Sequence, residues 1–149
     1  MKVGIATDHN GVNEKRELIE YLNTLGYEVI DYSTNNTPID DYPDFASIVC
    51  KSIINKEIDQ GILMCGTGIG MSITANKYSG IRCAKVSTSE EAKLAREHND
   101  ANIIALSYKM SIEELKTIIK SFLETAYSKD ERHIRRINKI RKIEEENGL

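Results

Sequence analysis

The sequence predicts an α/β fold in which helices cover both faces of a mostly parallel β-sheet. Strand-like and helical patterns alternate five times along the 149 residues, with short connections between them. This alternation is typical of consecutive βαβ units. Because βαβ crossovers are right-handed and a parallel sheet is buried on both faces, we expect a single, doubly wound, Rossmann-like domain.

Each predicted element rests on a local pattern. Short apolar runs bounded by polar or glycine-rich turns predict strands at residues 3–7, 28–32, 61–65, 81–86 and 102–106. Apolar residues at helical spacing, together with start signals such as Pro43, predict helices at residues 13–25, 42–54, 71–77, 89–98 and 112–126. We expect the strand order 2-1-3-4-5, which makes the first and third strands neighbours where ligands bind, at the carboxyl ends of the strands.

Composition excludes several classes of protein. A net charge of −3 argues against a nucleic-acid or anionic-membrane partner. The three cysteines form no C-x-x-C pair, which favours a reducing compartment over a disulfide framework or a zinc site. No apolar run approaches a membrane span, and the strand pattern from Lys2 leaves no room for a signal peptide. We therefore expect a cytoplasmic protein without a bound metal.

The segment 128–149 differs from the α/β domain predicted at residues 1–127. It is rich in arginine and lysine, and its isoleucines at 134, 137, 140 and 143 form a separate stripe. Arg132 and Arg136 lie four residues apart and share one face of a helix. No further strand remains for this helix to cover, so we expect it to pack on a neighbouring subunit.

A glycine-rich loop, Cys65 to Gly70, follows the third predicted strand and leads into a helix. Its three glycines lack side chains that would keep backbone N–H groups from converging on a ligand. A helix N-terminus also favours negative charge. Cys65 ends the strand at the mouth of this loop, where the same dipoles favour a thiolate. The loop therefore predicts a catalytic base beside a cradle for an oxyanion.

Motifs along the whole chain resemble those of the type B ribose-5-phosphate isomerases, a family grouped with the galactose-6-phosphate and allose-6-phosphate isomerases. The shared motifs, in order, are Asp8-His9, Asp41-Tyr42-Pro43, Cys65 to Gly70, Ala75-Asn76-Lys77, Gly80-Ile81-Arg82, Glu97 to Asn102, and Arg132-His133 with Arg136. Members without the cysteine carry a small residue there and a glutamate after the last glycine of the loop. With Cys65 and Met71, this chain resembles the cysteine branch.

The resemblance implies an enzyme that interconverts D-ribose 5-phosphate and D-ribulose 5-phosphate in the non-oxidative pentose phosphate pathway. The reaction would pass through a cis-enediolate and need no metal or cofactor. The family also implies a homodimer, or a dimer of dimers, with active sites shared between subunits. The implied roles are catalysis by Cys65 as base with Thr67 and His98 in ring opening, enediolate stabilisation by Gly66, Gly68, Gly70 and Asn99, and substrate binding by Asp8, His9, Tyr42, Arg132 and Arg136.

The chain departs from the family pattern at four places. Asp130-Glu131 replaces a usual Gly-Gly, and Lys109 stands where arginine is common. Lys109 also follows Ser107-Tyr108, where Gly-Ser or Gly-Ala is expected. Thr7 and Asn10, which flank Asp8-His9, replace small residues. These differences bear on substrate preference and phosphate binding more than on the type of reaction.

Other functions stay open at this stage. A nucleotide-binding oxidoreductase is disfavoured because the spacing of the glycines and their place after the third strand do not match a dinucleotide fingerprint. A non-catalytic sugar-phosphate sensor is disfavoured because Cys65, Thr67, His98 and Asn99 are all present. For an isomerase, six-carbon allose or galactose phosphates and a four-carbon sugar phosphate are alternatives to ribose 5-phosphate.

Overall fold

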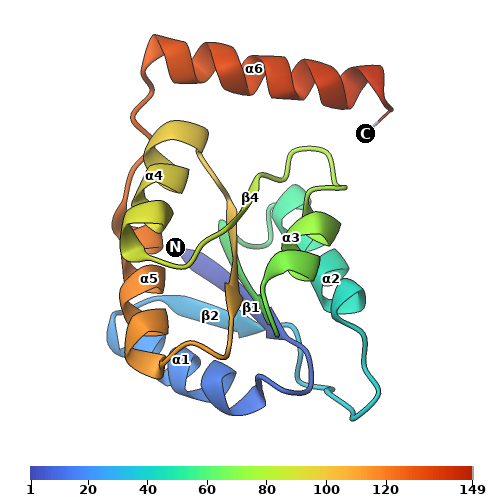
Figure 1. Cartoon of the computed structure of the whole chain (residues 1–149), viewed down its shortest axis with the longest axis vertical. Helices are drawn as coiled ribbons and strands as arrows, with labels where there is room; N and C mark the ends of the chain where they lie inside the picture. The colour runs from blue at the N-terminus through green and yellow to red at the C-terminus, as the bar shows by residue number, and fades with distance from the viewer. Residues whose placement is uncertain (149) are drawn as a thin grey trace.

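The computed structural model describes residues 1–148 and confirms the predicted α/β fold with a five-stranded parallel sheet (Figure 1). No helix within the described residues is long and apolar enough to cross a membrane. The strands are β1 (Lys2–Thr7), β2 (Glu28–Asp31), β3 (Gln60–Cys65), β4 (Cys83–Lys85) and β5 (Ile103–Ser107). The helices are α1 (Val12–Thr24), α2 (Tyr42–Ile54), α3 (Ile69–Ala75), α4 (Ser89–Asn99), α5 (Ile112–Glu124) and α6 (Glu131–Glu146).

Helices cover both faces of the sheet, as the doubly wound arrangement requires (Figure 1). On one face, Ile5 and Ile62 of the sheet pack with side chains of α1, α4 and α5. On the other face, Ala6 and Leu63 pack with side chains of α2 and α3. Consecutive strand residues thus enter opposite cores, which explains why the central strands are continuous apolar runs.

The order of the strands is β2-β1-β3-β5-β4, so the predicted order 2-1-3-4-5 is wrong in its last two strands. β5 pairs with β3 along its length, from Gly61 opposite Ile103 to Cys65 opposite Ser107. β4 is a three-residue edge strand whose residues are exposed or half-buried. The physical reason is burial, because the apolar run of β5 suits the centre of a sheet, whereas β4 ends in Lys85 and suits its edge.

The parallel strands give the sheet two chemically different edges. We call the edge formed by the strand C-termini, which includes Thr7, Cys65 and Ser107, the carboxyl edge. The opposite edge, where β1, β3 and β5 begin, is the amino edge. Helices between parallel strands run back from the carboxyl edge to the amino edge. Each such helix therefore starts at the carboxyl edge and ends at the amino edge.

The C-terminal helix α6 lies across one end of the molecule, beside the end of α4 (Figure 1). Only His133 and Ile137 of α6 are buried in this chain. Three isoleucines of the predicted stripe, Ile134, Ile140 and Ile143, are 39%, 40% and 57% exposed. The predicted basic helix therefore exists, and most of its apolar stripe is not covered by its own chain.

Candidate active site

The glycine-rich loop wraps around the sulfur of Cys65 at the carboxyl edge. Cys65 is 5% exposed, and the backbone N–H of Gly68 donates a hydrogen bond to its Sγ at 3.2 Å. Gly68 has φ of +79°, and a Cβ there would lie 3.1 Å from backbone atoms of Leu106. Glycine at this position therefore permits both the left-handed turn and the close approach of the loop to β5. An N–H donor aimed at the sulfur stabilises a thiolate.

Thr67 and Tyr42 complete the surroundings of the loop. The hydroxyl of Thr67 is exposed and accepts a hydrogen bond from the N–H of Ile69 at 3.1 Å. The ring of Tyr42, at the start of α2, lies over Gly70, where a Cβ would stand 2.7 Å from the Tyr42 hydroxyl oxygen. The absence of a side chain at Gly70 therefore allows the phenol to reach the loop.

Asp8 and His9 follow β1, the neighbour of β3, and so lie at the same edge. The backbone N–H and Nδ1 of His9 both contact Oδ1 of Asp40, at 3.0 and 2.7 Å. Burial raises the pKa of Asp40, but hydrogen bonds from Asn36 and His9 outweigh it, so the pKa of this carboxyl lies below its usual value. The ionised Asp40 holds the His9 ring in a fixed orientation.

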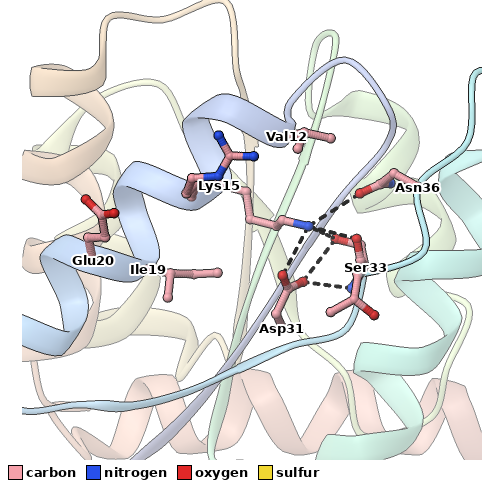
Figure 2. Close-up of a pocket in the computed structure, with 9 residues that line it drawn as sticks. Val12, Lys15, Ile19, Glu20, Asp31, Ser33 and Asn36 are labelled. Carbon is pink, nitrogen blue, oxygen red and sulfur yellow. Dashed lines mark hydrogen bonds and ion pairs between the residues drawn. The ribbon is translucent and has the colours of Figure 1, made fainter.

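A buried lysine of α1 is surrounded by oxygen atoms of Asp31, Ser33 and Asn36 (Figure 2). Lys15 of α1 is 4% exposed, and its Nζ lies 3.2 Å from Oδ2 of Asp31. The same ammonium donates hydrogen bonds to the carbonyl and hydroxyl oxygens of Ser33, at 2.7 and 3.1 Å, and contacts Asn36 Oδ1 at 3.4 Å. These groups line a cavity of about 440 Å³ between α1 and the segment at the end of β2. Because Lys15 has four oxygen partners, its charge is satisfied within the protein.

The lysine cluster is joined to the end of β1 by further hydrogen bonds. The N–H of Thr7 donates to Ser33 Oγ at 3.1 Å. The side-chain amide of Asn36 donates to the carbonyl oxygen of Thr7 and to Oδ2 of Asp40, both at 2.9 Å. One connected network therefore runs from Lys15 to His9. Apart from His9, no member of this network was predicted as a site residue, because the partners of Lys15 are 16 or more residues away from it in the sequence.

Tyr108 is a second residue that the sequence prediction missed at this edge. It follows β5, and its N–H donates to the carbonyl oxygen of Cys65 at 3.3 Å. A Cβ at Gly66 would lie 3.6 Å from the Tyr108 hydroxyl. The wrong strand order hid this contact, since it placed β4 beside β3. The continuous apolar run of β5 was the signal that could have corrected it.

The remaining predicted site residues gather at the amino edge. His98, near the end of α4, stacks on His133 of α6 with ring centroids 4.4 Å apart and an interplanar angle of 17°. Burial lowers the pKa of His133, and the charges of His98 and Arg132 lower it further. Asn99, Arg132 and Arg136 are exposed. Nε of Arg132 donates a hydrogen bond to Nε2 of His133 at 3.4 Å, so this arginine is attached to the histidine pair.

A single chain does not bring the two groups of residues together. Asp100, directly after Asn99, lines a hollow with Met1, which precedes β1, and with Gln60, the first residue of β3. Cys65 stands at the other end of β3, five residues further on, which is about 17 Å along an extended strand. His98 and Asn99 thus lie a strand's length away from the thiol in the same chain.

The other cysteines have structural surroundings. Cys50 is fully buried in the core between α2 and the sheet, and burial raises the pKa of its thiol to about 12. Burial also raises the pKa of Cys83. Among residues 1–148, no three His, Cys, Asp or Glu side chains are grouped so that they could hold a metal ion.

Comparison with known proteins gives one consistent result. A family model described as Ribose/Galactose Isomerase matches residues 3–140. Ribose-5-phosphate isomerase B of Escherichia coli is 39% identical over 145 residues, which cover 97% of each chain. YwlF of Bacillus subtilis, provisionally described as a sugar phosphate isomerase, is 45% identical over 149 residues, which cover 99% of each chain.

Solved structures agree with the sequence comparison. Ribose-5-phosphate isomerase B of Clostridium thermocellum superposes with a TM-score of 0.94 at 43% identity and covers 99% of each chain. The enzyme of Mycoplasma genitalium, solved with bound ribulose 5-phosphate, superposes with a TM-score of 0.91 at 39% identity and covers 97% of each chain. The similarity therefore spans the fold and both edges of the sheet.

Proposed function

Because the chain belongs to the Ribose/Galactose Isomerase family of sugar-phosphate aldose–ketose isomerases, we propose that it interconverts D-ribose 5-phosphate and D-ribulose 5-phosphate. The reaction is a step of the non-oxidative pentose phosphate pathway. The single observation that carries the proposal is the buried Cys65 sulfur, which receives the Gly68 N–H at the mouth of the glycine loop. The ribulose 5-phosphate bound to the Mycoplasma genitalium enzyme supports the choice of sugar.

In the proposed mechanism, Cys65 moves one proton between two carbons of the open-chain sugar. The thiolate removes the proton from C2 of the aldose, and the electron pair forms the C1–C2 double bond while the C1 carbonyl oxygen becomes an enediolate oxyanion. The thiol then returns the proton to C1 while the proton of the C2 hydroxyl moves to O1, so that the carbonyl forms at C2 and C1 becomes a hydroxymethyl group. No group is consumed, so the step needs no co-reactant.

The backbone amides of the glycine loop would stabilise the enediolate. Gly66, Gly68 and Gly70 surround Cys65, and a preorganised N–H donor of this kind is worth about 3 kcal/mol in the transition state. Asp8 and Tyr42 border the same space and would bind sugar hydroxyls. His9, held by Asp40, would bind the phosphate together with the basic residues described next.

We infer that a second subunit supplies the amino-edge residues. Ring opening by Thr67 with His98, oxyanion binding by Asn99, and phosphate binding by Arg132 and Arg136 require these groups near Cys65. Because one chain holds them at opposite edges of its sheet, a two-fold pairing that sets the carboxyl edge of one subunit against the amino edge of its partner would complete two equivalent sites. The exposed isoleucines of α6 would be covered in such an assembly.

The test is ketose formation from a panel of aldose phosphates, with ribose 5-phosphate first and allose, galactose and four-carbon phosphates beside it. We expect turnover of ribose 5-phosphate to survive a chelator and to fall at least about 1,000-fold in Cys65→Ala, since both the base and its proton are lost. Cys50→Ala is the matched control, because it removes a buried thiol away from the loop and should leave kcat unchanged.

Two outcomes would change the proposal. A six-carbon phosphate that turns over faster than ribose 5-phosphate would keep Cys65 as base but reassign the substrate. No reaction with any member of the panel, or full activity in Cys65→Ala, would overturn the catalytic role of the loop.

A further inference from the structure

Tyr108 occupies the space between the two loops that form the carboxyl edge. It begins the connection after β5, which pairs with β3 up to Cys65 opposite Ser107. The Ser107 hydroxyl donates to the carbonyl oxygen of Gly66 at 2.7 Å, and the Tyr108 N–H donates to that of Cys65 at 3.3 Å. Two hydrogen bonds therefore attach the β5 end to the glycine loop and fix the origin of the Tyr108 side chain.

The direction of the Tyr108 ring follows from the glycines that it contacts. Gly11, just after the Asp8-His9 segment, is buried, and a Cβ there would lie 2.7 Å from Tyr108 Cδ2. At the other end of the ring, the hydroxyl lies 3.6 Å from the position of a Cβ on Gly66. The phenol thus extends from the β1 loop towards the glycine loop, across the site where the sugar is proposed to bind.

The Tyr108 hydroxyl is a neutral hydrogen-bonding group in this position. Burial raises its pKa, a hydrogen bond with Asn10 lowers it, and both the charge of Asp8 and a hydrogen bond with it raise it. The Asn10 side chain and the Asp8 carboxylate are therefore neighbours of the Tyr108 hydroxyl. Tyr108 is therefore held beside the carboxylate proposed to bind the sugar.

Three of the positions at which the sequence departs from the type B isomerase pattern meet at this phenol. Asn10 interacts with its hydroxyl. Thr7 packs, like the Tyr108 ring, against the space that a Gly11 side chain would fill. The large residue at 108 and the polar residues at 7 and 10 thus form one cluster at the carboxyl edge, in which Thr7 is buried behind the Tyr108 ring.

We propose that Tyr108 determines substrate length, its ring filling the space between Asp8 and Cys65 so that five-carbon sugar phosphates are accepted in preference to six-carbon ones. The inference rests on the proposed function. The glycine loop would hold C1 and C2 of the substrate, and His9 would hold its phosphate. The distance between the reacting carbons and the phosphate is then fixed. A further hydroxymethylene group must bend out of that span, towards the side of Asp8 that the phenol occupies.

The test compares two substrates on the same preparation. The ratio of kcat/KM for ribose 5-phosphate to that for allose 6-phosphate is measured for the wild type, Tyr108→Ser and Tyr108→Phe. We expect the ratio to fall at least about tenfold in Tyr108→Ser, the lower bound of discrimination by one methylene-sized group. Tyr108→Phe keeps the ring and should keep the ratio within about twofold. The ratio does not depend on the folded fraction of a preparation.

Several results would overturn the inference. An unchanged ratio in Tyr108→Ser leaves the isomerase function standing and removes Tyr108 from substrate selection. Loss of both activities in a folded Tyr108→Ser assigns Tyr108 to catalysis instead. Should Tyr108→Ser fail to fold, the same ratio of kcat/KM values is measured on Tyr108→Leu, which keeps an apolar contact with Gly11. A wild type that converts neither sugar phosphate refutes both this inference and the proposed function.

Discussion

The carboxyl and amino edges of the sheet each pair a histidine with an aspartate, but the two pairs have different geometry. His9 Nδ1 lies 2.7 Å from Asp40, whose side chain is 9% exposed. His133 Nε2 lies 4.0 Å from Asp130, whose side chain is 57% exposed. A close and nearly buried carboxylate therefore orients the histidine of the carboxyl edge, whereas the histidine of the amino edge has only a distant, exposed carboxylate beside it. In the proposed pairing, the amino edge of one subunit would complete the carboxyl edge of its partner.

The largest effect is expected from mixing variants of opposite edges. Cys65→Ala and His98→Gln should each lose at least about 100-fold in turnover, the usual range for a catalytic proton-transfer group. Co-refolded at equal amounts, they should recover about a quarter of wild-type activity, because half of the dimers are mixed and each has one intact site of two. This recovery is measured by comparing the activity of the co-refolded mixture with the activity of each variant alone.

The control for this experiment mixes two variants of the same edge. Cys65→Ala with Asp8→Asn should recover nothing, since each site of the mixed dimer keeps one defect. Equal recovery in both mixtures would contradict the shared site, and recovery in neither would place the complete site within one chain.

A smaller effect should separate the glycines of the two edges. Gly68 and Gly80 both have positive φ, +79° and +84°, but a Cβ at Gly68 would meet the Leu106 backbone at 3.1 Å, whereas nothing lies within 4 Å of one at Gly80. Gly80→Ala should cost about 1 kcal/mol of unfolding free energy for the left-handed backbone alone. Gly68→Ala should cost about 3 kcal/mol, since overpacking against the backbone is added.

Urea denaturation of the two glycine variants gives both values on one scale. Equal losses would mean that the loop at Cys65 moves freely away from β5. That result would contradict a preorganised oxyanion cradle at the carboxyl edge.

The smallest effect concerns the two aspartates and depends on pH. Asp40→Asn should cost about 1.5 kcal/mol at pH 7, the lower range for hydrogen bonds to a charged group. Because the pKa of Asp40 is lowered in the folded state, its contribution is present above the unfolded pKa of about 3.9. It is lost as the pH falls below that value. Asp130→Asn should change stability little at any of these pH values, since the exposed 4.0 Å pair contributes little.

Stability curves of both aspartate variants between pH 7 and pH 2 provide the measurement. A constant loss in Asp40→Asn over this range would show that the carboxylate charge is not what holds His9. A loss in Asp130→Asn as large as that in Asp40→Asn would remove the contrast between the two edges.

The sequence by itself determined the local structure and the chemistry of the central loop. Hydrophobic periodicity depends on neighbouring residues, and it correctly predicted five parallel strands, the helices between them and the basic C-terminal helix. The same local reasoning placed Cys65 at the end of its strand and Asp8-His9 at the end of β1. Since the carboxyl ends of parallel strands share one edge, these groups could be expected to meet without any coordinates.

Only the tertiary structure decided which strands are neighbours and which residues share an edge. Strand pairing depends on burial across the whole sheet, so neither β4 nor β5 alone determines the order of these two strands. The contact between Tyr108 and Cys65 depends on that order. From the sequence alone, Lys15 would be interpreted as a cation on the surface of its helix. In the structure, Asp31, Ser33 and Asn36 enclose it. The separation of His98 from Cys65 follows from the length of β3, because a helix that returns between parallel strands must end at the edge opposite to the one where the thiol lies.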